Sequence, residues 1–130
     1  MNLGAQAAAR IYREHAVDGA SPARLVRLLL ERALRGLERA GACDAGDPRS
    51  PFVSELQRAA DIVTELRLSI VPSGDAAADE TAAATHALYE FVGVQIHTAL
   101  AQRSAEPALL ARPVLQSLLE AWSKIEEGQA

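Results

Sequence analysis

The sequence has one cysteine, and its aromatic residues, which include one tryptophan, make up only 4% of its 130 residues. Because Cys43 is alone, a disulfide within the chain is excluded, and a cysteine-based zinc site would lack its other ligands. Charged residues interrupt every apolar stretch before the ~20 residues that a membrane-spanning helix needs. The N-terminal residues show no basic region followed by an apolar run, so we expect a cytoplasmic protein without membrane insertion.

A basic excess is also missing, since the net charge is -4 and the pI is near 5.3. Proteins that bind nucleic acid neutralise phosphates with clustered Lys and Arg, so the balance argues against nucleic acid as the main partner. Arginines do gather between residues 24 and 39, but Glu31 and Glu38 interrupt them. We therefore interpret this segment as a solvated helix face.

Residues that commonly carry catalysis form no recognisable arrangement in this sequence. His86 and His97 lie too far apart along the chain to share a metal ion on one helical turn. Asp44 and Asp47 lack the ligand spacing of a calcium loop. We therefore expect no enzyme activity, no metal and no cofactor.

What the sequence does contain is apolar residues at helical spacing, in segments separated by links rich in Gly, Pro, Asp and Ser. The pattern predicts four long helices, at about residues 22–42, 52–71, 76–103 and 107–127. Four helices joined by short links favour an all-α fold, an antiparallel up-down four-helix bundle. Residues 21–130 are expected to form this bundle, and residues 1–20 a short, mobile N-terminal helical arm.

Local signals predict where three of these helices begin. Ser21 is expected to cap the first helix, with Pro22 in its first turn. Asp75 or Asp79 is expected to cap the third helix. Pro113 should either kink the fourth helix near its start or confine the regular helix to later residues.

Two of the expected helices have more apolar residues than one buried face requires. In the first helix, Leu28 and Leu30 flank a core stripe made of Leu25, Leu29, Ala33 and Leu37. In the third, Tyr89, Ile96 and Leu100 widen an apolar arc whose core stripe is Ala84, Leu88, Phe91 and Ala99, with Val92 to one side. Gly93 adjoins this wider arc and leaves a notch that another backbone could approach. Either the helices are simply broad, or a groove here receives an amphipathic helix or an extended peptide.

Short motifs then follow one another in the order of a known family. They are Tyr12, Val17, Ala20-Ser21-Pro22, Glu65-Leu66, Leu88-Tyr89-Glu90 and Ala121-Trp122. Over about residues 12–125 the chain resembles FliS, a family of flagellar export chaperones that bind flagellin. It departs from the family pattern at Leu29-Leu30-Glu31-Arg32, where Leu-Tyr-Asp-Gly is usual, and at Ser69-Ile70-Val71, where an acidic residue is lost.

The resemblance implies a cytoplasmic chaperone that holds the disordered C-terminal segment of new flagellin, prevents premature polymerisation and supports secretion. We expect the flagellin-facing set to be Leu28, Leu30, Tyr89, Val92, Ile96 and Leu100. In the family an N-terminal arm covers part of the binding surface when flagellin is absent, and Ile11, Tyr12 and Val17 match that arm.

An alternative from a different class stays open at this point. The chain could be a non-catalytic helical adaptor or regulator whose extra apolar face is a homodimer interface or another protein interface. The flagellar export apparatus and other flagellar proteins also remain open as further partners.

Overall fold

The structure is a computed structural model that describes residues 21–70 and 72–128, and every regular element within these ranges is a helix. The helices are α2 (Pro22–Gly41), α3 (Phe52–Leu68), α4 (Ala76–Gln102), α5 (Glu106–Leu110) and α6 (Arg112–Gly128). The predicted helical bundle is confirmed, with α5 and α6 together replacing the fourth predicted helix. The arm predicted at residues 1–20 lies outside the described residues, so the division into arm and bundle stays a prediction.

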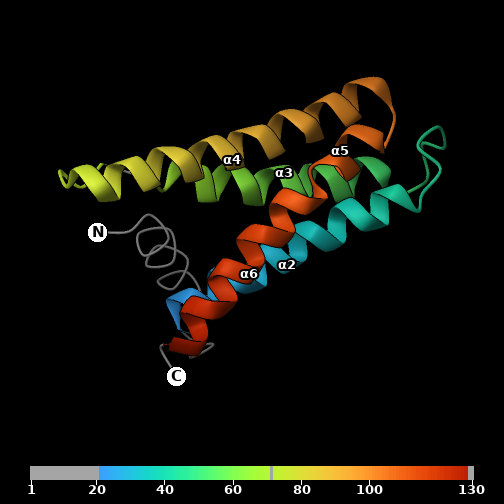
Figure 1. Ribbon diagram of the computed structural model, residues 1–130. Helices are drawn as coiled ribbons and strands as arrows, with labels where there is room; N and C mark the ends of the chain where they lie inside the picture. Colours follow the sequence, from blue (N-terminus) through green and yellow to red (C-terminus); the bar gives the residue numbers. More distant parts are fainter. Residues whose placement is uncertain (1–20, 71, 129–130) are drawn as a thin grey trace.

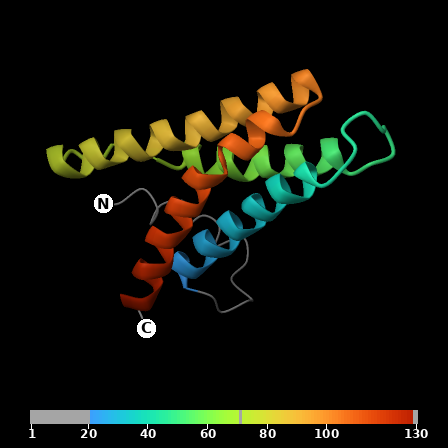
Figure 2. The ribbon, with the colours of Figure 1, turned by 45° about the vertical axis from the view of Figure 1, so that its right-hand side comes forward.

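The long helices form two antiparallel pairs, in which α3 lies beside α4 and α2 lies beside α6 (Figures 1 and 2). The two pairs meet near α5 and diverge toward the start of α4 and the end of α6 (Figure 1). α2 packs against both α3 and α6, whereas α4 packs mainly against α3 and α5 and makes few contacts with α6. The bundle is therefore built around α2, and α4, the longest helix, packs less extensively for its length.

The start of α2 is fixed as the sequence predicts. The Ser21 Oγ accepts a hydrogen bond from the Arg24 backbone N–H at 3.2 Å, and a proline occupies the first turn. Gly36, in the middle of the same helix, allows α3 to come close, because a Cβ there would lie 3.1 Å from the Glu55 carbonyl oxygen. Local capping and a small residue together place α2 against its neighbour.

The turn before α4 uses its acidic residues differently from the prediction. Asp75 occupies the N-cap position, but its side chain makes no capping hydrogen bond. The Asp79 carboxylate instead reaches back and accepts hydrogen bonds from the backbone N–H of Ser73 at 2.7 Å and of Gly74 at 3.2 Å. Asp79 therefore stabilises the turn before α4. Gly74 in this turn has a φ of 89°, a backbone conformation that glycine adopts more readily than other residues.

Pro113 lies in the first turn of α6, where a backbone N–H would have no partner within the helix. The chain consequently breaks at Ala111, between α5 and α6, instead of bending one continuous helix. Of the two outcomes that the sequence left open, the structure comes nearer to the second: the proline lies in the first turn of α6, and the residues before it form the separate short helix α5.

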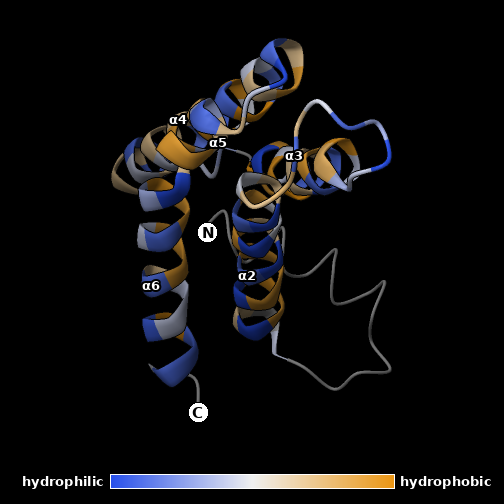
Figure 3. Ribbon diagram, turned by 90° about the vertical axis from the view of Figure 1, so that its right-hand side faces the viewer, coloured by the Kyte–Doolittle hydropathy of each residue, from blue (hydrophilic) through white to orange (hydrophobic). Residues whose placement is uncertain are grey.

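The core is apolar and draws most heavily on α2. Val26, Leu30, Ala33 and Leu37 of this helix are completely buried. They cover more than one narrow stripe because α2 has neighbours on two sides. In Figure 3, α6 directs its hydrophilic residues away from α2, as expected when its apolar face packs inward.

An ion-pair cluster ties the end of α6 to the start of α2. Two guanidinium nitrogens of Arg27 donate hydrogen bonds to the Glu126 carboxylate, and a third donates to Glu31 at 2.6 Å. Both Arg27 and Glu126 are partly shielded from solvent. Because Arg27 donates these hydrogen bonds, the pKa of the Glu126 carboxyl lies below its ordinary value of 4.5.

We expect Glu126→Gln to destabilise the protein at neutral pH and to have less effect in acid. A carboxyl whose pKa is lowered by folding stabilises the protein above its unfolded pKa, and this contribution is lost as the pH falls through the lowered value. Urea unfolding between pH 3 and pH 7 measures the difference, with Glu127→Gln at the exposed neighbouring position as the control. A difference between wild type and Glu126→Gln that stays constant over this range would contradict the expectation.

Candidate protein-binding site

The two predicted partner-facing residues of α2 have opposite environments. Leu28 is 39% exposed, as expected, and lies on the face that also carries Arg32 and Arg35. Leu30 is completely buried, so the prediction that it faces a partner at the surface is wrong. The reason is the two-sided packing of α2, which requires a wider apolar arc than a helix at the edge of a bundle.

On α4 most of the predicted inward and outward residues are exchanged, although Ala99 is buried as expected. Tyr89 is 3% exposed, and Val92 and Ile96 are completely buried, so these three residues belong to the core. Leu88 and Phe91, which were assigned to the core, are each 41% exposed. Because α4 is apolar around most of its circumference, its periodicity permits either face to turn inward, and packing against α3 selects one of them.

Tyr89 is buried together with its hydroxyl. Burial raises the pKa of the Tyr89 phenol to about 12, and the side chain of Trp122 on α6 acts in the opposite direction by favouring the ionised form. Leu100, the last predicted site residue on this helix, is partly buried against the core.

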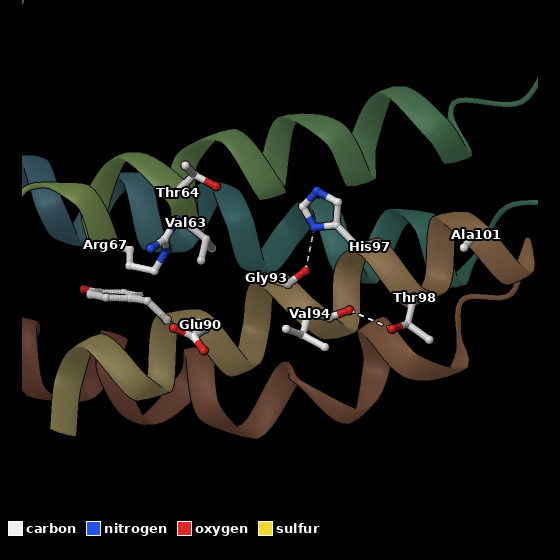
Figure 4. A pocket seen from close by; sticks show the side chains of 10 residues that line it. Val63, Thr64, Arg67, Glu90, Gly93, Val94, His97, Thr98 and Ala101 are labelled. Atoms are coloured by element: carbon white, nitrogen blue, oxygen red, sulfur yellow. Dashed lines mark hydrogen bonds between the residues drawn. The ribbon is translucent and has the colours of Figure 1, made fainter. Parts of the chain in front are cut away.

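A groove between α3 and α4 is the concave surface of this region, with a volume of about 550 Å³. Figure 4 shows it running along α4, with Arg67 and Glu90 at one end and Ala101 at the other. Val94 is 55% exposed beside it. The lining residues come from both helices: Val63, Thr64, Arg67, Tyr89, Glu90, Gly93, Val94, His97, Thr98 and Ala101.

Polar side chains are distributed along this groove and do not converge on one point. The Arg67 Nη1 lies 3.5 Å from the His86 Nε2, and the His86 Nδ1 lies 3.8 Å from a Glu90 carboxylate oxygen. The His97 Nδ1 lies 2.8 Å from the Gly93 carbonyl oxygen, with which it is hydrogen-bonded (Figure 4). Within residues 21–70 and 72–128, no cluster of three or more His, Cys, Asp or Glu is arranged to hold a metal ion. The groove therefore combines separate polar groups with the exposed apolar side chain of Val94.

A second apolar surface lies on another face of α4. Leu88 and Phe91 are one turn apart, Ala84 precedes them by another turn, and all three are exposed. None of them lines the groove. α4 therefore presents apolar residues to solvent on two faces as well as packing on the core.

The sequence pointed to two of the residues that line the groove, Tyr89 and Gly93, and missed the others. Val63, Arg67 and Val94 were not singled out, because nothing in their spacing shows that α3 and α4 lie side by side at this level. Gly93 was the available signal, since a glycine inside a helix normally has a steric or functional reason.

Comparison with protein families now identifies the chain. A family model described as "Flagellar protein FliS" matches residues 4–129, nearly the whole sequence. The chain belongs to the FliS family. The resemblance seen in the short sequence motifs is thereby confirmed, and FliS proteins are generally the export chaperones of flagellin.

Two further results accompany the FliS assignment. Comparison with curated proteins gave no significant match. In the part of the chain that the structure describes, no helix has both the length and the apolar character needed to cross a membrane. The FliS arm residues predicted at Ile11, Tyr12 and Val17 lie outside the described residues.

The different environments of Leu28 and Leu30 give a direct test of this FliS structure. We expect Leu30→Ala to lower the free energy of unfolding by about 2–5 kcal/mol, because it leaves a cavity in the core. Leu28→Ala should change it by less than about 1 kcal/mol, since this side chain is at the surface. Urea denaturation followed by circular dichroism measures both values, and equal losses in the two variants would contradict the assignment.

Proposed function

We propose that this protein is a cytoplasmic export chaperone that binds the C-terminal segment of flagellin. In this role it keeps the segment from polymerising before export and supports its secretion. The FliS family match over residues 4–129 is the observation that carries the proposal. FliS is not known as an enzymatic family, and the proposed activity is binding alone.

The exposed apolar surface of the bundle supports this proposal on physical grounds. A disordered segment loses conformational entropy when it folds on a partner, so it needs apolar area to offset that cost. Such area is available on α4 at Val94, Leu88 and Phe91 and on α2 at Leu28, each of which is at least 39% exposed. An amphipathic helix that forms on binding can cover surfaces of this kind, with contacts repeated at each helical turn.

The decisive experiment is a calorimetric titration of the full chain with the C-terminal segment of flagellin from the same organism. We expect binding with a Kd of about 10 μM or tighter, corresponding to roughly 7 kcal/mol. Repeating the titration at several temperatures should give a negative heat-capacity change, because apolar surface is buried. A segment of the same composition in scrambled order is the control.

Absence of binding at about 50 μM segment would overturn the proposal. The chain would then be better described as a helical adaptor with another protein partner. Sedimentation of the free chain, measured alongside, tests whether the exposed apolar residues form a homodimer interface instead.

The N-terminal arm enters the proposal through the family resemblance at Ile11, Tyr12 and Val17. If the arm competes with flagellin for the same surface, part of the binding energy is used to displace it. Deletion of residues 1–18 should then strengthen binding of the flagellin segment in the same titration. An unchanged or weaker affinity, in a deletion variant that unfolds like the full chain, would contradict competition.

A further inference from the structure

Gly93 has no steric reason to be a glycine in the structure described. A glycine inside a helix destabilises it relative to alanine, so its presence needs a cause. A Cβ at Gly36 would lie 3.1 Å from the Glu55 carbonyl oxygen, and a Cβ at Gly41 would lie 3.1 Å from a Leu109 methyl carbon. At Gly93 an added Cβ would meet no atom within 4 Å among the described residues. The space that Gly93 leaves open belongs to the groove between α3 and α4.

The shape of this groove matches a helix lying along α4. Glu90, Gly93, Val94, His97 and Ala101 recur at each turn, so the groove extends over about 16 Å of α4 at 1.5 Å per residue. Helices bound in grooves make their contacts at this same repeat. The missing side chain at Gly93 lets a partner backbone come closest near the middle of the groove.

The charges at one end of the groove indicate what the partner carries. Within the described residues, the Arg67 guanidinium makes its polar contact with His86, at 3.5 Å. Glu90, the acidic residue that lines the groove, lies 3.8 Å from the same histidine. Arg67 thus retains hydrogen-bond donors for which the described chain offers no carboxylate. A carboxylate on the partner, one or two turns from the residue packed on Gly93, would complete its hydrogen bonding.

We propose that the α3–α4 groove binds one amphipathic helix of the flagellin segment. The helix packs along α4 with a small or branched apolar side chain against Gly93 and Val94, and it places a carboxylate on Arg67. This inference rests on the proposed function and gives it a site. Of the lining residues, the sequence had pointed to Tyr89 and Gly93, whereas the α3 side and Arg67 come from the structure.

Gly93→Leu is the most direct test, because its side chain would occupy the groove while the neighbouring space remains open to receive it. Calorimetric titration with the flagellin C-terminal segment should show binding at least about tenfold weaker than for wild type. The urea midpoint should not fall, since leucine favours the helix more than glycine does. Ser117→Leu adds the same side chain at an exposed position of α6 outside the groove, and it should bind like wild type.

Two further variants extend the test beyond this substitution. Val94→Glu changes an exposed groove residue and places a carboxylate near the partner's own, so it should also weaken binding. Arg67→Gln should weaken binding by about two- to fivefold at 50 mM salt and by less at 500 mM, as expected for a partly exposed ion pair. Arg58→Gln removes an exposed arginine of the same helix that does not line the groove, and it serves as the matched control.

The outcomes separate the site from the function. If wild type binds the segment and Gly93→Leu and Val94→Glu bind it equally well, the groove assignment is overturned and the proposed function survives. If wild type does not bind the segment, the proposed function fails and the assignment fails with it. If wild type sediments as a dimer that Gly93→Leu dissociates, the occupant is a second copy of the chain, which also overturns the assignment to flagellin.

Discussion

The burial of α2 on two sides is the constraint on which the rest of the structure depends. Its leucines and small residues pack against α3 on one side and α6 on the other, and Gly36 brings α3 close. Apolar burial of this kind contributes roughly 1.5–3 kcal/mol for each large side chain, so this helix accounts for much of the stability of the fold. The ion pairs of Arg27 at its start then fix where the end of α6 lies.

Because α2 occupies the centre, α4 packs less extensively for its length. It packs on α3 and α5 and contacts α6 at few places, one of which joins Tyr89 to Trp122. A long helix in this position keeps apolar residues at the surface on more than one face, as Leu88, Phe91 and Val94 show. A chaperone has use for such residues, since it must offer apolar area to a segment that has not yet folded.

The helices of this protein could be predicted from its sequence, but their inward faces could not. Ser21 and the proline at the start of α6 marked helix boundaries through local chemistry, and the structure places both boundaries there. The faces of α4 depend on which neighbours it meets, and periodicity does not determine this when apolar residues surround most of the helix. Tyr89 shows the difficulty, because it was expected to face a partner and is buried in the core.

The candidate site was predictable only in part, for a related reason. Gly93 could be recognised as unusual from the sequence, whereas its relation to Arg67 depends on how α3 and α4 pack together. Leu28 and Leu30 were both assigned to the flagellin-facing set, and the packing of α2 against neighbours on two sides buries Leu30 while Leu28 stays exposed. Long-range packing therefore decided every part of the site that local patterns left open.

The groove between α3 and α4 is the site proposed for the flagellin segment. The most direct measurement is the amide NMR spectrum of the full chain, recorded with and without the C-terminal segment. The largest shift changes should fall at Gly93, Val94 and Ala101 and at Thr64 and Arg67 across the groove. Changes confined to α2 and α6, with these amides unmoved at saturation, would contradict the account.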